Sequence, residues 1–257
     1  MKKILLGVFL ILAIFGFIWY QNFNQDYSKN KDINTLIIGT SADFPPFSFR
    51  DNNDDIVGFD IDVAKEVANR IGLNYKVIDQ QFSMLLSQAQ LGQIHVIAAG
   101  MTPTEERAKK LRFTKTYLTD NPLLVVTLKG KTPEIKSLQD LKSKDIIVNT
   151  GYTADLYMSD FPDINLIRLS KVSDAFTALD NGKGYAFVTA AFTLNPYLKD
   201  LGTDKYNIFK IYQTDETSAL GVSKLISQEL FNKIEKAIED MDLDGTMQSL
   251  KKKWDLI

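Results

Sequence analysis

The sequence has no cysteine and only one histidine in 257 residues. Without cysteine there can be no disulfide, thiolate metal site or thiol nucleophile, and one histidine excludes most catalytic triads and histidine-rich metal clusters. No P-loop, dinucleotide-binding or zinc motif is present either. We therefore expect no catalytic residues, no metal and no cofactor. His95 lies between two apolar residues in a predicted strand, which favours a structural role.

The chain also lacks an excess of basic residues. Its 30 lysines and arginines are offset by 32 aspartates and glutamates, a formal net charge of −2. Nucleic-acid-binding proteins carry basic patches that neutralise phosphates, so we expect no nucleic-acid partner. Hydrophobic residues make up 45% of the chain, which is enough for the core of one large domain or two smaller ones.

Residues 1–20 have the pattern of a membrane segment. Lys2 and Lys3 precede an uncharged run over residues 4–20. As a helix rising ~1.5 Å per residue, this run spans about 25 Å, the lower limit for crossing a bilayer. It contains no small-x-small cleavage pattern, so we expect an uncleaved signal anchor, with a cleaved signal peptide as the alternative. Both place the rest of the chain on the extracytoplasmic face of the membrane, with the polar residues 21–35 as a tether.

Strand-like and helix-like segments alternate after residue 35. Helical spacing of apolar residues and glycine stops predict helices at 61–71, 83–91 and 173–179, and another after Gly151. Short apolar runs predict strands at 36–40, 75–78, 94–98, 122–128, 145–149, 165–169 and 185–189. The alternation is typical of α/β units with parallel-rich sheets, and it begins afresh near residue 130.

Residues 98–107 carry the clearest functional signal. The segment ends a predicted strand, and Thr102, Pro103 and Glu105 are typical of an N-cap, a first helical residue and a capping box. Arg107 follows within about one turn. Free amides at a helix start and a guanidinium together favour a carboxylate ligand. The same pattern also fits an ordinary helix start whose arginine faces solvent.

Taken in order, the motifs resemble a known family, the extracellular solute-binding proteins of ABC importers for polar amino acids. The resemblance is carried by segments spread over nearly the whole chain after the tether: 39–49, 57–64, 99–107, 113–117, 137–141, 244–246 and 253–254. It implies a two-lobed type II periplasmic-binding-protein fold with a two-strand hinge. Residues 36–119 and 215–257 would form lobe 1, and residues 120–214 would form lobe 2.

The resemblance also implies a function. A small amino acid would be captured in the cleft between the lobes and delivered to the permease and ATPase subunits of an importer, by a protein that we expect to be a monomer. Binding would favour the closed arrangement of the lobes.

Particular residues match the family's ligand-binding positions. Arg107 matches the arginine that pairs with the α-carboxylate, helped by the amides of Thr102 and Thr153. Gly100 and the Thr102 hydroxyl match acceptors for the α-ammonium group. The aromatic residues that sandwich the ligand side chain are matched by Phe44 and Phe82.

One position departs from the family pattern. The aspartate that neutralises the α-ammonium is replaced by Ala190. Three interpretations follow. Another acid such as Asp155 supplies the missing negative charge, the ligand has no α-amine, or the ligand binds weakly. Ser41 stands where basic-amino-acid binders carry an aspartate, and Asn149 and Thr189 would line the same pocket without charge. These residues favour a ligand with an uncharged side chain.

Two other functions remain open at this stage. A sensory or regulatory ectodomain on the same fold could bind a small carboxylate. The fold also hosts a dehydratase acting on cyclohexadienyl carboxylates, for which an arginine clamp would still serve.

Overall fold

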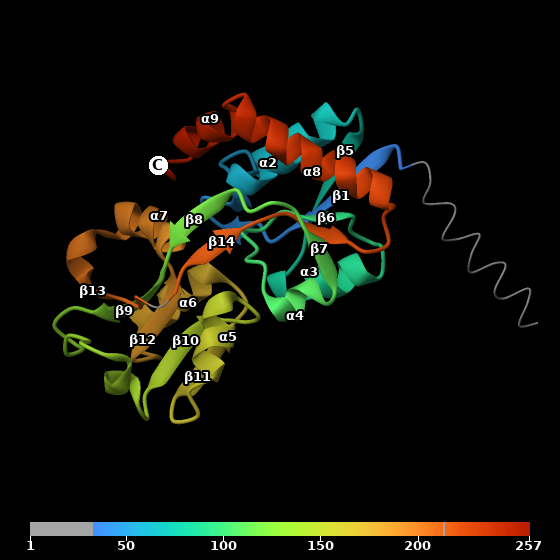
Figure 1. Ribbon diagram of the computed structural model, residues 1–257. Helices are drawn as coiled ribbons and strands as arrows, with labels where there is room; N and C mark the ends of the chain where they lie inside the picture. The colour runs from blue at the N-terminus through green and yellow to red at the C-terminus, as the bar shows by residue number, and fades with distance from the viewer. Residues whose placement is uncertain (1–32, 213) are drawn as a thin grey trace, which may run out of the picture.

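Two mixed β-sheets organise the chain, each covered by helices (Figure 1). The computed structural model describes residues 33–212 and 214–257. The predicted membrane segment at 1–20 and nearly all of the tether at 21–35 lie outside the described residues. Within the described part, no helix is long and apolar enough to cross a bilayer.

Lobe 1 is built on a five-stranded sheet in the order β5-β1-β6-β15-β7. β1 runs parallel to β5 and β6, whereas β15 is antiparallel to β6 and β7. The strands are β1 (Thr35–Thr40), β5 (Asn74–Asp79), β6 (Val96–Ile97), β7 (Leu111–Phe113) and β15 (Gly221–Ser223), and a small sheet adds β2 (Asp43–Phe44), β3 (Ser48–Arg50) and β4 (Ile56–Val57). The helices are α2 (Phe59–Arg70), α3 (Phe82–Gln90), α4 (Glu105–Ala108), α8 (Gln228–Leu243) and α9 (Thr246–Lys253).

Lobe 2 repeats the plan with the strand order β11-β10-β12-β9-β13. β10 is parallel to β11 and β12, and β9 is antiparallel to β12 and β13. The strands are β9 (Leu123–Leu128), β10 (Asp145–Asn149), β11 (Asn165–Leu169), β12 (Ala186–Ala190) and β13 (Tyr206–Lys210). The helices are α5 (Thr153–Ser159), α6 (Val172–Asp180) and α7 (Ala191–Leu201), with 3-10 turns η2 (Leu138–Leu141) and η3 (Thr203–Lys205).

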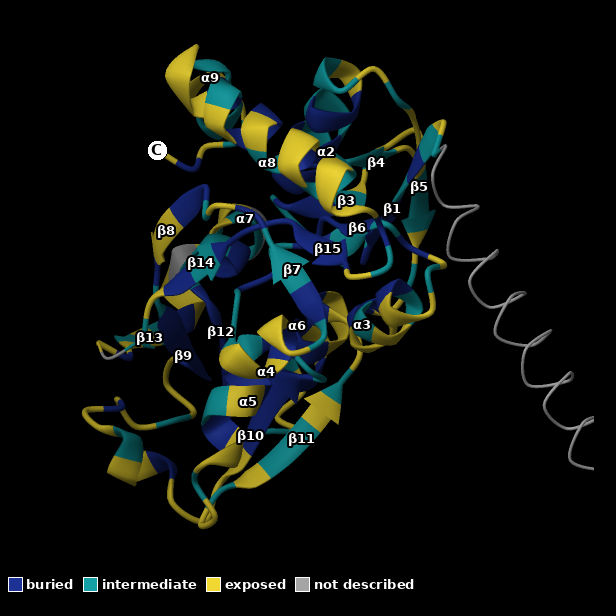
Figure 2. Ribbon diagram, turned by 45° about the vertical axis from the view of Figure 1, so that its right-hand side comes forward, coloured by how far each residue is buried: buried dark blue, intermediate teal, exposed yellow. Residues whose placement is uncertain are grey.

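The lobes are linked by a two-stranded antiparallel sheet of β8 (Leu118–Asn121) and β14 (Glu216–Ser218). Figure 1 shows these strands passing between the upper and lower lobes. The boundaries predicted at 119/120 and 214/215 lie in or beside these strands and stay a prediction. Burial follows the layering: in Figure 2 the central strands β10 and β12 are buried, whereas α8 and α9 expose their outer faces.

Most of the helices and strands predicted from the sequence are present. The structure differs from the prediction in strand direction, in the length of one strand and in one additional helix. Both sheets carry an antiparallel strand next to the hinge: β9, which follows β8, in lobe 2, and β15, which follows β14, in lobe 1. The predicted strand at 94–98 pairs only at Val96–Ile97. Helix α7 is absent from the prediction because Pro196, which normally breaks a helix interior, lies within it.

Candidate functional site

Arg107 is a buried arginine that bonds across the gap between the two lobes. It belongs to α4 of lobe 1 and is 6% exposed. Its Nη1 donates to the carbonyl of Thr102 at 2.8 Å, and its Nη2 donates to the carbonyl of Gly151, in lobe 2, at 2.9 Å. It forms no ion pair with a carboxylate of the described residues. Burial lowers the pKa of Arg107, and an anionic ligand would supply the counter-charge that this guanidinium lacks.

The local structure around Arg107 corrects the predicted helix start. Helix α4 is a single turn that begins at Glu105, and its N-cap is Thr104, whose Oγ1 accepts from the backbone N–H of Arg107 at 3.2 Å. A helix beginning at Pro103 would use the carbonyl of Thr102 for its first backbone hydrogen bond. Here that carbonyl accepts from the guanidinium instead. The carboxylate hypothesis therefore depends on the guanidinium rather than on a helix N-terminus.

Gly100 and Thr102, two further predicted site residues, lie just before this turn. The N–H of Gly100 donates to Asp60 Oδ2 at 2.6 Å, and its φ is +59°. A Cβ added at Gly100 would lie 2.6 Å from Cε1 of Phe44, so only glycine fits both the backbone conformation and the ring. The Oγ1 of Thr102 is buried without a hydrogen-bond partner among the described residues, which leaves it available to a ligand.

We expect the Gly100→Ala substitution to destabilise the protein by about 1–3 kcal/mol, since left-handed strain and a ring contact act together. Urea unfolding measures this. Gly130→Ala is the matched control, because Gly130 has φ +77° and nothing within 4 Å of an added Cβ. If both variants lose the same free energy of unfolding, backbone strain alone explains the effect, and a Cβ at position 100 does not clash with Phe44.

Aromatic rings from both lobes meet beside Arg107. Phe44 on β2 and Phe82 at the start of α3 are the two predicted sandwich residues, and both are buried. The guanidinium carbon of Arg107 lies 5.4 Å from the centre of the Phe82 ring. Tyr152 of lobe 2 contacts both, with ring centres 5.2 Å from Phe44 and 4.3 Å from Phe82. The phenol of Tyr152 thus fills the space beside the two rings.

Tyr152 also lines a small cavity of about 10 Å³, room for roughly one water molecule. Its walls come from β2, β10, β12, β14 and the start of α5: Phe44, Asn149, Tyr152, Ala154, Val188, Thr189, Ala190 and Glu216. The structure therefore brings the predicted residues Asn149 and Ala190 together with Phe44. Nδ2 of Asn149 donates to the carbonyl of Leu169 at 3.2 Å.

Glu216 is the acid that lines this cavity, and it is not among the site residues predicted from the sequence. It opens β14 and is 9% exposed. Burial raises the pKa of Glu216 to about 7, although the Thr153 side chain and the Arg107 guanidinium both favour its ionised form. In the sequence it follows Gln213, Thr214 and Asp215, a polar run that indicates exposure. No local signal identified it, because it is buried by residues far away in the sequence, from both lobes.

Asp155 does not reach the cavity, contrary to the compensating role considered for it. Its Oδ1 accepts from Nε of Arg168 at 2.8 Å and its Oδ2 accepts from the N–H of Gly151 at 2.9 Å. Both oxygens are thus engaged within lobe 2, where they hold the loop that carries Tyr152 and Thr153. Ser41 is also engaged, donating from Oγ to Asp43 Oδ1 at 2.7 Å.

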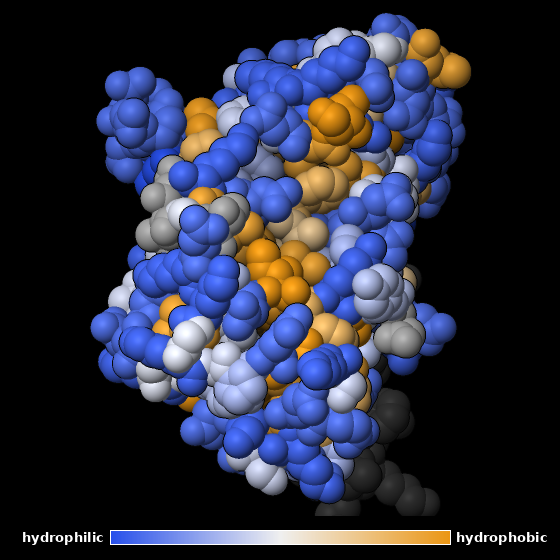
Figure 3. Space-filling model, turned by 90° about the vertical axis from the view of Figure 1, so that its left-hand side faces the viewer, coloured by the Kyte–Doolittle hydropathy of each residue, from blue (hydrophilic) through white to orange (hydrophobic). Residues whose placement is uncertain are grey.

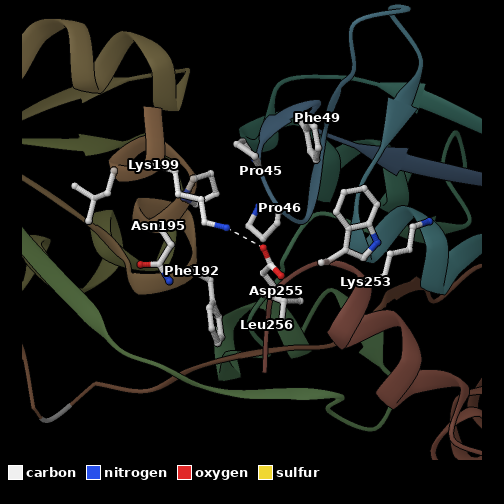
Figure 4. Close-up of a pocket in the computed structure, with 12 residues that line it drawn as sticks. Pro45, Pro46, Phe49, Phe192, Asn195, Lys199, Lys253, Asp255 and Leu256 are labelled. Atoms are coloured by element: carbon white, nitrogen blue, oxygen red, sulfur yellow. Dashed lines mark hydrogen bonds and ion pairs between the residues drawn. The ribbon is translucent and has the colours of Figure 1, made fainter. Parts of the chain in front are cut away.

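A larger groove of about 620 Å³ lies between the lobes, at α7 and the C-terminus (Figure 4). Figure 3 shows apolar side chains gathered across the middle of the face that carries these elements. Its charged groups are already paired, Lys199 with Asp255 and Lys253 with Asp62. It therefore lacks the charges that hold a zwitterion. Among residues 33–212 and 214–257, no group of three or more His, Cys, Asp or Glu residues could hold a metal ion.

Known proteins similar to this chain identify its family. The sequence profile of the bacterial extracellular solute-binding proteins, family 3, matches residues 36–256. The arginine-binding extracellular protein ArtP of Bacillus subtilis (strain 168) is 31% identical over 223 residues, which cover 85% of each chain. A solved structure of an ancestral arginine-binding protein bound to arginine is 35% identical with a TM-score of 0.79, covering 86% of this chain and 98% of that one.

A third similar structure is the ancestral amino-acid-binding protein AncCDT-1, described as a precursor of cyclohexadienyl dehydratase. It is 29% identical with a TM-score of 0.79, and the match covers 89% of this chain and 99% of that one. The profile match spans both sheets, the strands that join them and helix α4, which carries Arg107. With its two hinged α/β lobes and a buried arginine between them, the chain belongs to the bacterial extracellular solute-binding proteins of family 3.

Proposed function

We propose that the protein is the substrate-binding subunit of an amino-acid ABC importer, and that Arg107 binds the α-carboxylate of the captured amino acid. The observation that carries this proposal is a 6%-exposed guanidinium, between two lobes, that has no carboxylate partner among the described residues. Similar proteins of this family are named for binding amino acids, which supports the ligand class.

Closure of the lobes would couple capture to delivery. In the described arrangement the lobes are held together by hydrogen bonds between Arg107 and Gly151 and between the N–H of Val172 and Asp43 Oδ2, at 2.9 and 3.3 Å. A carboxylate bound to Arg107 would strengthen the same arrangement, because it would contact both lobes. A ligand that makes more contacts in the closed state shifts the population toward it, and a permease could then recognise that state.

Location and partners follow from the family. We propose that the folded lobes act on the extracytoplasmic face of the membrane, with a permease and an ATPase as partners. The anchor predicted at residues 4–20 would keep them near the permease. A monomer would suffice, because the proposed site is formed by one chain.

For the ligand side chain we propose an uncharged group. Ser41 replaces an acid at the position that favours basic ligands, and Asp43 is engaged by Ser41 and by the N–H of Val172. Burial raises the pKa of Asp43, which further weakens it as a partner for a cation. Arginine and lysine are therefore expected to bind less tightly than neutral amino acids.

The test is a thermal-shift series on the full chain with each of the twenty L-amino acids. A ligand at 100 times its dissociation constant stabilises the folded protein by ~2.7 kcal/mol, which is readily measured. We expect the largest shift from a neutral amino acid. No shift with any amino acid would refute the proposal, and a largest shift with arginine would refute only the side-chain part.

We expect Tyr152→Ala to widen the range of ligands. An amino acid with a bulky side chain must displace the Tyr152 ring from Phe44 and Phe82, and exposing a buried side chain of this size costs about 1.5–3 kcal/mol. Removing the ring should thus tighten binding of phenylalanine or methionine by about tenfold to a hundredfold. Titration calorimetry checks this. Unchanged affinities in the variant would mean that Tyr152 does not compete with the ligand.

One observation favours a second candidate, a dehydratase acting on a cyclohexadienyl carboxylate. Glu216 has a pKa of about 7 and lies near Arg107, so it could donate a proton to a departing hydroxyl group. Incubation with prephenate tests this candidate, since loss of water and carbon dioxide yields phenylpyruvate. We expect no product. Product that disappears in Glu216→Gln would establish the enzyme instead.

A further inference from the structure

An α-amino acid brings two charges into the cleft, and Arg107 accounts for only one of them. The ammonium group needs an anionic partner, because a buried charge without one costs several kcal/mol. Ala190, at the end of β12, offers a methyl group at the position where the family resemblance implies an aspartate. Asp155, the alternative in the same lobe, is engaged by Arg168.

Glu216 lies on the same cavity wall as Ala190. Among the described residues that line this cavity it is the one acid, and it forms no ion pair with a described residue. It comes from a different element, the hinge strand β14. Glu216 pairs with Asn121 of β8, and the register of the two strands shifts between Glu216 and Ser218. Irregularities of this kind can change the direction in which a side chain points.

We propose that Glu216 binds the α-ammonium group of the ligand, in place of the aspartate missing at Ala190. Arg107 and Glu216 then hold the two ends of one zwitterion. This inference depends on the proposed amino-acid ligand and deepens it. The partner of the ammonium group would then lie on β14, a strand that joins the lobes, so the ligand would contact the hinge directly.

The surroundings of Glu216 fit this role. Arg107 approaches from α4 with opposite charge, Asp215 precedes it with like charge, and Thr153 and Tyr152 face it from the loop and first turn of α5. Arg107 and Glu216 attract each other, yet they form no ion pair in the described residues. An ammonium group beside Glu216 would favour its ionised form, so a zwitterion would place an opposite charge against each of the two side chains.

Glu216→Gln provides the test, with ligands that differ only in the amine. For each L-amino acid that binds the full chain, titration calorimetry also measures the corresponding L-2-hydroxy acid, for example L-lactate beside L-alanine. The substitution should weaken amino-acid binding by about thirtyfold or more and change hydroxy-acid binding little. Asp215→Asn, the same change one residue earlier at an exposed site, should leave both affinities nearly unchanged.

A second variant keeps the inference falsifiable if Glu216→Gln binds weakly for structural reasons. Adding Ala190→Asp to Glu216→Gln restores a carboxylate to the same cavity and should recover amino-acid binding. Equal amino-acid affinity in wild type and Glu216→Gln would overturn the inference while leaving the proposed function intact. Equal losses for amino and hydroxy acids, without rescue by Ala190→Asp, would also overturn it. If the wild-type protein binds no amino acid, the proposed function fails and this inference falls with it.

Discussion

Arg107→Ala is expected to abolish measurable amino-acid binding. Truncating one partner of a buried charge pair costs about 2–5 kcal/mol, which corresponds to a loss of roughly thirtyfold to several thousandfold in affinity. The loss should extend to 2-hydroxy acids, because Arg107 is proposed to bind the carboxylate that both ligands share. Titration calorimetry with the amino acid that shifts the wild type most measures it.

Two further variants sharpen this prediction. Lys109→Ala removes an exposed positive charge two residues away and should leave affinity nearly unchanged. Arg107→Lys keeps the charge but loses the planar fork that matches a carboxylate, so it should recover only part of the affinity. Circular dichroism checks that the variants are folded. Wild-type affinity in a folded Arg107→Ala protein would exclude this residue from the site.

The unliganded protein is expected to lose stability as the pH rises from about 4 to about 7. Burial raises the pKa of Glu216 from 4.5 to about 7 and that of Asp60 from 3.8 to about 7. The folded protein holds these two protons up to about pH 7, whereas the unfolded chain releases them near pH 4. The unfolded chain therefore binds fewer protons in this window, and the free energy of unfolding falls by about 3–4 kcal/mol per group.

Urea unfolding without ligand between pH 4.5 and 7.5 measures this fall. Glu216→Gln and Asp60→Asn should each remove the part of this fall that comes from its own carboxyl group. In the double variant the free energy of unfolding should change little with pH. Asp244, whose pKa Arg70 lowers to about 2, loses its contribution only below about pH 4, so it does not mask the effect. Parallel curves for wild type and both variants would show that these carboxyl groups titrate normally.

Local patterns were sufficient for much of the fold. Apolar runs such as β10 and amphipathic segments such as α2 form where their periodicity predicts them, because burial of one face or of a whole strand is encoded locally. Helix α7 was not predictable from its own residues, because its packing outweighs the effect of Pro196. The start of α4 was predicted at the wrong residue, because the N-cap is Thr104 and not Thr102, whose carbonyl accepts from the Arg107 guanidinium.

Some residues of the candidate site could also be predicted from the sequence, and others could not. Arg107, Gly100 and Phe44 lie in short motifs and Phe82 was matched through the family resemblance, and the structure brings all four to one gap between the lobes. Tyr152 has no comparable signal, since its contacts with Phe44 and Phe82 join residues about 70 to 110 positions apart.

The sequence by itself determined the family, the two-lobed plan and the arginine proposed to bind the ligand carboxylate, because each can be recognised from motifs of contiguous residues. Only the tertiary structure decided that Tyr152 packs against both phenylalanines, that Asp155 is engaged elsewhere and that Glu216 and Ala190 line one cavity. The physical reason is that the burial of Glu216 and the charge of Arg107 beside it come from segments far away in the sequence, whereas its own neighbours in the chain are polar.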